Sequence, residues 1–410
     1  MFSSLCILGR QPSLGLAELE SLFSAETIQR VGDSAALLDI SPGDVPFSRL
    51  GGAVKLCRVL TTLDTTDWQK ICVLLEETVS HQITDLPKGK IKLGLSLYGF
   101  DIPINQISPA GLSLKNIIKK AGRSARVVPN TASALNSAQV LHNRLTGPLG
   151  MELVIVRDNN RAIVAQTSVE QDIASYTLRD RGRPKRDARV GMLPPKLAQI
   201  ILNLALGQIE GEGRRAKGKK NSALCSPPSA LTVLDPFCGT GVLLQEALLM
   251  GYDANGTDID PRMIEYTKAN LDWLQKSYNL QPITYNLMQG DATSFRWTEP
   301  FDVVATETYL GRPFTTPPDD KTLSATVNDC NVIIKKFLGN LANQTKSDTR
   351  LCLAVPAWHV NDNFIHLPLL DSLTDMGYTR LSFVHADNKD LIYYREGQIV
   401  ARELIVLIRL

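Results

Sequence analysis

The chain has 410 residues, about 2.7 times the ~150 residues of a typical domain, so we expect two or three domains. Hydrophobic residues make up 44%, charged residues 21% and the net charge is +2, which is ordinary for a globular protein and excludes a disordered or collagen-like chain. We expect no membrane span or secretory signal, since no apolar run nears ~18 residues, and the scattered cysteines predict no metal site and a reducing, cytoplasmic location.

The first half of the chain has an irregular pattern of short helices and strands. Helical spacing is present over residues 16–23 and 114–120, and residues 91–97 alternate like a strand. A hairpin is predicted for residues 153–156 and 162–165, around Asp158-Asn159-Asn160. These elements predict an α+β region with a split near residue 80.

The second half begins after a Gly-, Ser-, Pro- and Lys-rich loop over residues 211–229. Strands and helices then alternate, which predicts a doubly wound parallel sheet. The connector before the last strand has no room for a crossover helix, so that strand is expected to be antiparallel. The predicted strands are 231–236, 254–259, 283–288, 301–306, 350–355, 381–386 and 401–410, and the helices are 241–250, 262–278, 327–341 and 364–376.

Basic side chains are concentrated in two stretches. Residues 171–220 hold twelve Lys or Arg and five Asp or Glu, a local charge of +7, and residues 111–130 hold five basic residues and no acid. A single charge run is usually a solvated helix face, but two in a nearly neutral chain favour a footprint on nucleic acid phosphates. The candidate phosphate contacts are Lys115, Lys119, Arg123, Arg179, Arg181, Arg183 and Lys185.

Glycines and acids follow the first strands of the second half. Asp235 ends the first strand and precedes the turn Gly239-Thr240-Gly241, where glycine allows the backbone to approach a ligand closely. Asp258 ends the next strand, about where an acid meets ribose hydroxyls, and Asp291 follows the third. The third glycine of a dinucleotide fingerprint and the Lys-Ser/Thr of a P-loop are missing, so phosphate cradling has no support.

This ensemble resembles the class I S-adenosylmethionine-dependent methyltransferases. The residues Asp-Pro-Phe-Cys-Gly-Thr-Gly at 235–241, the run 258–263 and the upstream Pro195-Lys196-Leu197-Ala198 resemble more narrowly the THUMP-containing RNA guanine-N2 methyltransferases, some of which methylate guanosine 10 of tRNA. The resemblance covers most of the chain and is strongest over 176–292. It implies S-adenosylmethionine as cofactor, tRNA as partner, and the cofactor contacts Asp235, Phe237, Gly239, Thr240, Gly241, Asp258, Ile259, Asp291 and Ala292.

The resemblance also implies the fold and the division of the chain. The fold class is α/β, with a Rossmann-like methyltransferase sheet that has an antiparallel last strand and an α+β N-terminal half that contains a THUMP-like domain. The expected parts are a ferredoxin-like α+β domain (1–80), a THUMP-like RNA-binding domain (81–170), a basic linker and helix (171–229) and the methyltransferase domain (230–410).

The fourth-strand motif departs from the family pattern, which is Asp-Pro-Pro-Tyr or Asn-Pro-Pro-Phe. Here Glu307-Thr308-Tyr309 replaces it, without either proline. A guanine amine is a poor nucleophile because its lone pair is delocalised into the ring, and acceptors for its two hydrogens would localise that pair. We therefore expect Glu307 to accept the amine and Tyr309 to stack on the flipped base, as the catalytic residues.

Two other functions stay open at this point. The first is an RNA-binding protein whose methylase fold has decayed at the fourth strand, although the intact cofactor acids argue against it. The second is a DNA amino-methylase, which the basic N-terminal half makes less favourable because no helix-turn-helix pattern accompanies it. The sequence leaves open the nucleotide, the RNA species, mono- or dimethylation, a small partner subunit and the oligomeric state.

Overall fold

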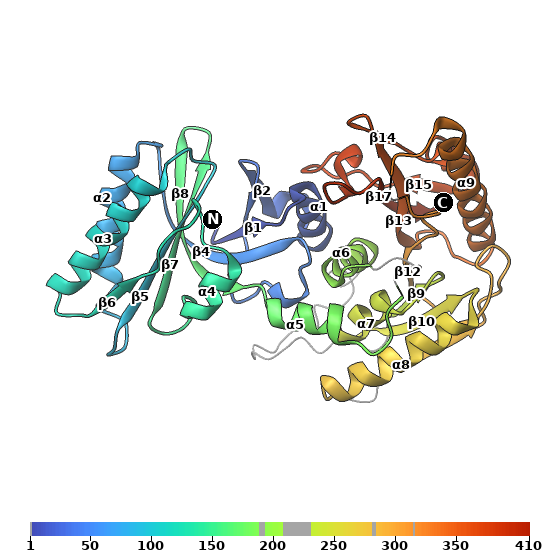
Figure 1. The fold of residues 1–410 in the computed structure, drawn as a ribbon, viewed down its shortest axis with the longest axis horizontal. Helices are drawn as coiled ribbons and strands as arrows, with labels where there is room; N and C mark the ends of the chain where they lie inside the picture. The colour runs from blue at the N-terminus through green and yellow to red at the C-terminus, as the bar shows by residue number, and fades with distance from the viewer. Residues whose placement is uncertain (1, 188–192, 208–230, 281–283, 315) are drawn as a thin grey trace. The chain divides into compact units, whose positions relative to one another are not determined.

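The computed structural model describes residues 2–187, 193–207, 231–280, 284–314 and 316–410, which excludes the predicted loop over 211–229. The chain divides into two compact units (Figure 1). The first comprises Met1–Leu16, Ala25–Ser48 and Gly52–Ala174, and the second comprises Ala17–Ser24, Arg49–Gly51 and Ser175–Leu410. Within the described ranges, no helix has the length and apolar character needed to cross a bilayer.

The first unit is built on one mixed sheet, with the strand order β2-β3-β1-β4-β8-β7-β5-β6 among its described residues. Helices α2 and α3 lie side by side and cover a core on β5 and β7 (Figure 1). The strands are β1 Ser4–Leu8, β2 Ile28–Val31, β3 Ala35–Leu38, β4 Ala53–Leu63, β5 Ile91–Tyr98, β6 Ala125–Val127, β7 Gly150–Asp158 and β8 Arg161–Glu170. The helices are α1 Pro12–Phe23, α2 Trp68–Gln82, α3 Ile104–Lys120 and α4 Ser137–Asn143.

The predicted split near residue 80 is wrong, because this position lies inside α2. Strands from both sides of it share one sheet, since β4 pairs with β8 over most of its length. The hairpin predicted around residues 158–160 is confirmed, with β7 antiparallel to β8. Helix α3 begins ten residues earlier than predicted, because Pro109 lies inside the helix and interrupts its sequence pattern.

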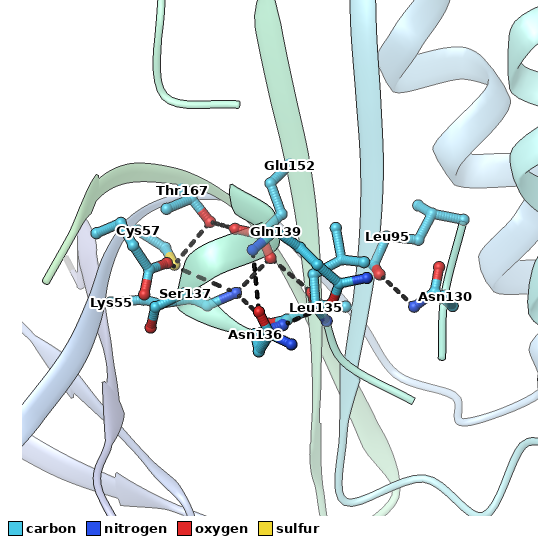
Figure 2. A network of polar contacts seen from close by, with 12 residues as sticks. Lys55, Cys57, Leu95, Asn130, Leu135, Asn136, Ser137, Gln139, Glu152 and Thr167 are labelled. Carbon is cyan, nitrogen blue, oxygen red and sulfur yellow. Dashed lines mark hydrogen bonds and ion pairs between the residues drawn. The ribbon is translucent and has the colours of Figure 1, made fainter. Parts of the chain in front are cut away.

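A buried network around the ion pair of Lys55 and Glu152 joins four strands of this sheet, β4, β5, β7 and β8, to the loop before α4 (Figure 2). Glu152 also accepts hydrogen bonds from the hydroxyls of Ser96 and Thr167, each at 2.6 Å. Lys55 donates to the carbonyl of Leu135 at 3.1 Å, and the N–H of Leu135 donates to Ser96 at 2.9 Å. Because both charged side chains are buried, the network is stable only when every partner is present.

Replacing Glu152 with alanine should therefore lower the free energy of unfolding by about 3–5 kcal/mol, because it leaves the buried Lys55 ammonium with only the more distant Glu170 carboxylate, at 3.7 Å. Urea denaturation measures this change. Glu77→Ala removes an exposed carboxylate from α2 and should stay within about 0.5 kcal/mol of wild type. Equal unfolding midpoints for the two variants would contradict a stabilising role of the network.

The second unit contains the predicted doubly wound sheet, in the order β11-β10-β9-β12-β13-β17-β15 among its described residues. The first five strands in this order are parallel, and β17 is antiparallel to β13, which confirms the expected last strand. The strands are β9 Thr232–Asp235, β10 Asp253–Asp258, β11 Tyr285–Gln289, β12 Val303–Glu307, β13 Arg350–Val360, β14 Asn363–Ile365, β15 Tyr378–Arg380, β16 Ile392–Tyr393 and β17 Val400–Arg409. The helices are α5 Ile173–Thr177, α6 Pro195–Leu206, α7 Val242–Leu249, α8 Pro261–Ser277 and α9 Asp320–Ala342.

Helices cover both faces of this sheet (Figure 1). Helix α9 buries Ile334 and Phe337 in a core with Val304 and Leu353 of the sheet. Helix α6 is apolar on all sides and is buried against β12, β13 and α7, as expected for a helix without a solvent face. The sheet is thus buried on both faces, which explains the continuous apolar runs of β12 and β13.

A short N-terminal segment completes the second unit. Glu18, in the later part of α1, accepts hydrogen bonds from the Asn203 side chain at 2.7 Å and from the Gly51 N–H at 2.9 Å. Arg350 donates to the hydroxyl of Ser21 at 2.6 Å. The contiguous boundaries expected from the sequence therefore do not describe this part of the chain.

The helix predicted over residues 364–376 is wrong. Asn361 and Asp362 both have positive φ, so the chain turns tightly from β13 into β14. Two 3₁₀ turns follow, Pro368–Ser372 and Thr374–Met376. The strand predicted at 381–386 is also displaced, because β15 ends at Arg380.

Candidate active site

The sheet of the second unit carries a cavity of about 930 Å³ at the edge where its parallel strands end. This volume lies at the upper end of the range of ~300–1,000 Å³ that small-molecule sites occupy. The cavity brings together all of the predicted cofactor and catalytic residues except Gly241. Its lining includes Asp235, Phe237, Gly239, Thr240, Asp258, Ile259, Asp291, Ala292, Glu307 and Tyr309.

The glycine turn between β9 and α7 is held in place by Asp258. Its Oδ2 accepts the Gly239 N–H and its Oδ1 accepts the Asp260 N–H, each at 2.9 Å. Gly239 and Gly241 both have positive φ, which favours glycine. A Cβ on Gly241 would lie 2.7 Å from the Thr267 side chain, so Gly241 shapes the turn behind the cavity instead of lining it.

Asp235 is a buried acid beneath this turn. Its Oδ1 accepts the Thr306 hydroxyl at 2.6 Å and the Phe237 N–H at 3.3 Å. Burial, with smaller contributions from the nearby carboxylates of Asp258 and Glu307, raises the pKa of Asp235 to about 7, although the two hydrogen bonds oppose the rise. The protein thus holds a carboxyl group that titrates near neutral pH next to the cavity.

The tips of β10 and β11 differ in exposure. Burial raises the pKa of Asp258, whereas Asp291 is exposed and accepts hydrogen bonds from the N–H and hydroxyl of Thr293. Ile259 is 67% exposed, an apolar side chain left open beside two acids. Gly290 precedes Asp291, and a Cβ there would lie 2.0 Å from the Phe295 ring, so the close packing of this tip requires glycine.

Glu307 lies at the end of β12 and forms an ion pair with Arg402 of β17, in which the Nε of Arg402 donates to Oε1 of Glu307 at 2.5 Å. Both side chains are mostly buried, with 13% and 10% exposure respectively. Tyr309 is 44% exposed and follows Thr308, whose N–H and hydroxyl both donate to the carbonyl of Ala354. The cavity therefore presents a fixed carboxylate beside an open aromatic ring.

Several residues of the cavity wall were not predicted from the sequence, and Arg402 is the most important of them. A signal was present, because Arg402 and Glu403 are adjacent charges in an otherwise apolar strand, and buried charges are found paired. The other unpredicted lining residues include Pro236, Cys238, Asp260, Met263, Gly290, Thr293, Thr308, Arg312, Lys336 and Gln398.

Three of the predicted phosphate contacts are corrected by their surroundings. Arg179 is buried and pairs with Glu246 at 2.7 Å, and Arg183 is only 3% exposed. Arg123 donates to the backbone carbonyls of Ile83 and Leu86, which anchors the end of α3. These guanidinium groups therefore serve the fold. The exposed candidates are Lys119, Arg181 and Lys185, and Lys115 is half-buried.

The comparisons with known proteins agree with this geometry. A family model described as "Methyltransferase domain" matches residues 228–388. A protein from Methanothermococcus thermolithotrophicus named "Probable tRNA (guanine(10)-N2)-dimethyltransferase" is 35% identical over 125 residues, which are 30% of this chain and 68% of the relative. A tRNA (guanine(10)-N2)-dimethyltransferase from Methanothermobacter thermautotrophicus is 29% identical over 166 residues, 40% of this chain and 39% of the relative.

A solved structure, TrmN from Thermus thermophilus, shares the fold with a TM-score of 0.51 and 15% identity over the full length of both chains. The matches to the first three curated relatives span only 31% to 39% of those relatives' own length.

The strand order, the antiparallel last strand and the acids at the strand ends define a class I methyltransferase domain. The chain belongs to the tRNA (guanine(10)-N2)-dimethyltransferase family.

Proposed function

We propose that the protein transfers a methyl group from S-adenosylmethionine to the exocyclic N2 of a guanosine in tRNA. The observation that carries this proposal is the position of Glu307, which shares one cavity with the acids and glycines of the first three strand ends. Doubly wound folds bind their ligands at this edge. The names of the relatives, tRNA (guanine(10)-N2)-dimethyltransferases, support guanosine as the target.

The residues around the glycine turn fit the proposed cofactor. Gly239 lies at the cavity with φ of +51°, so the backbone is open to a close approach by a ligand. We assign the ribose hydroxyls to Asp258, the adenine amine to Asp291 and an apolar adenine contact to Ile259. Asp235 offers a carboxylate to the positively charged methionine end. When bound, S-adenosylmethionine supplies an electrophilic methyl group on a sulfonium.

The target amine needs acceptors for its two hydrogens. In the proposal, Glu307 accepts one through its carboxylate, and the Thr308 backbone carbonyl accepts the other. These two bonds localise the nitrogen lone pair, and Tyr309 stacks on the flipped base to hold the nitrogen in line. The hydrogen bond to Glu307 strengthens as the nitrogen gains positive charge, so its effect falls mainly on the transition state.

We propose that the other parts of the chain hold the tRNA. We expect the THUMP-like RNA-binding part to lie within the first unit and the basic linker to be residues 171–229, with Lys115, Lys119, Arg181 and Lys185 as phosphate contacts. The exposure of Lys119, Arg181 and Lys185 supports this role, since a phosphate contact requires a side chain that reaches solvent. A tRNA substrate also favours a cytoplasmic location.

Glu307→Ala should lower single-turnover methyl transfer to unmodified tRNA by about 100-fold, because the amine loses its charged acceptor. Cofactor affinity, measured by calorimetry, should stay near wild type. Asp302→Ala, which removes an exposed carboxylate directly before the first residue of β12, serves as the matched control and should react at the wild-type rate. Equal rates for wild type and a folded Glu307→Ala variant would rule out the assigned role.

Cofactor affinity should fall by about tenfold between pH 8 and pH 6. The ionised form of Asp235 favours the cationic ligand, and its raised pKa of about 7 means that protonation competes with binding below that pH. Calorimetry at several pH values tests this. Asp235→Asn should bind more weakly at pH 8 and should lose the part of the pH dependence that belongs to this carboxyl. An identical pH profile in the variant would contradict it.

Replacing Lys119, Arg181 and Lys185 with alanine should flatten the salt dependence of tRNA binding by about two to three units in the log–log slope, since each neutralised phosphate contributes about 0.7–0.9. Filter binding at several salt concentrations measures the slope. A charge-matched control, with Lys70, Lys346 and Lys389 changed to alanine, should keep the wild-type slope. If both triple variants behave alike, the specific footprint is wrong.

A further inference from the structure

We propose that Arg402 is a positioning residue of the reaction, which orients the Glu307 carboxylate toward the guanosine amine through their ion pair. This inference rests on the proposed function and deepens it, because Arg402 acts through Glu307 and has no assigned contact with the methyl donor.

The topology explains how an arginine from the last strand reaches this place. Strand β13 lies between β12 and β17, and in its register Ala354 pairs with Glu307 while Pro356 pairs with Arg402. Because β17 runs antiparallel, its first residues lie at the edge where the parallel strands end. Ala354 and Pro356 are two residues apart and point to the same face, so Glu307 and Arg402 meet over β13.

The small side chains of β13 leave room for this contact. Ala354 and Pro356 are both buried on this face and bring no long side chain between the two charged groups. The ion pair joins Nε of Arg402 to Oε1 of Glu307, so it fixes the carboxylate plane while Oε2 is left for the substrate amine. Glutamate has one more side-chain torsion than aspartate, and a fixed partner removes that freedom.

Glu307 shares its part of the cavity with other titratable groups. Asp235 of β9 lies near enough that Glu307 contributes to its raised pKa, so two carboxylates share this part of the cavity. The other titratable groups that line the cavity are Cys238 after β9, Asp258 and Asp260 at and after the end of β10, Asp291 after β11, Tyr309 and Arg312 after β12, and Lys336 of α9.

Two more groups lie close to Arg402 in the sheet. Tyr393 of β16 pairs with it in register, and Glu403 is its chain neighbour. Glu403 is held by Arg380 at 2.9 Å and by His366, so its charge has its own partners. Among the described residues, only Arg402 forms an ion pair with Glu307, so it is the positive charge that offsets this carboxylate beside the neighbouring acids.

The test is a double-mutant cycle on single-turnover methyl transfer to unmodified tRNA. Arg402→Gln should slow transfer by about 30- to 100-fold with cofactor affinity within about twofold of wild type. Because Arg402 acts through Glu307, the double variant Glu307→Gln/Arg402→Gln should be no slower than Glu307→Gln alone. Multiplied losses in the double variant would overturn the proposal.

The pH profile separates positioning from a structural role. In Arg402→Gln the acid limb of the rate should move to higher pH by about one unit, since Glu307 loses its opposite charge. Arg402→Lys keeps the charge and should keep the acid limb, but should react about tenfold more slowly because a lysine ammonium does not fix the carboxylate plane. An Arg402→Lys variant as fast as wild type would overturn the orienting role. This comparison can still be made if the Arg402→Gln variant does not fold.

Arg380→Gln is the matched control, because it also removes an arginine from an ion pair with a glutamate. That glutamate, Glu403, follows Arg402 in β17, so its side chain points to the opposite face of the sheet. The Arg380→Gln variant should lower the free energy of unfolding, while the rate of methyl transfer and the acid limb of its pH profile stay at wild type.

Failure of the proposed function can be distinguished from failure of this inference. A wild type that never methylates tRNA overturns the proposed function and this inference together, whereas an active wild type with an equally fast, unshifted Arg402→Gln variant overturns the role of Arg402 alone.

Discussion

The antiparallel direction of β17 is the constraint on which the active edge depends. In an all-parallel sheet, every strand would bring only its last residue to the ligand side. Here the start of β17 lies at that edge, so Arg402 meets Glu307 across β13. The same edge collects Asp235 and Asp258 from β9 and β10, and a single cavity then holds both the expected cofactor groups and the expected amine acceptor.

The cavity gathers more carboxylates than a neutral ligand would need. Burial and mutual repulsion raise the pKa of Asp235, and burial raises that of Asp258, so the site favours a cationic ligand. A sulfonium cofactor would supply such a charge, and an amine that becomes positive during attack would supply another. Arg402 offsets the charge of Glu307 alone, which leaves the other acids to the cofactor.

Sequence reasoning was most successful where local patterns and tertiary structure agree. The strand, glycine turn and helix around Asp235 and the antiparallel last strand were predicted, because alternation of strand and helix and turn chemistry are local signals. The helix predicted over 364–376 was wrong because a turn at Asn361 and Asp362 overrode an apolar pattern. The roles of Arg179, Arg183 and Arg402 could not be predicted, since whether an arginine faces solvent or a buried carboxylate depends on contacts far apart in the sequence.

The central claim is methyl transfer to a guanosine amine of tRNA. It is tested most directly by incubating the protein with S-adenosylmethionine carrying a deuterated methyl group and unmodified tRNA, followed by mass spectrometry of the nucleosides. The account predicts the label in N2-methylguanosine or N2,N2-dimethylguanosine. Label on an adenosine or cytidine amine, or no transfer by a protein that binds both cofactor and tRNA, would contradict it, and the second result would favour an RNA-binding protein that has lost catalysis.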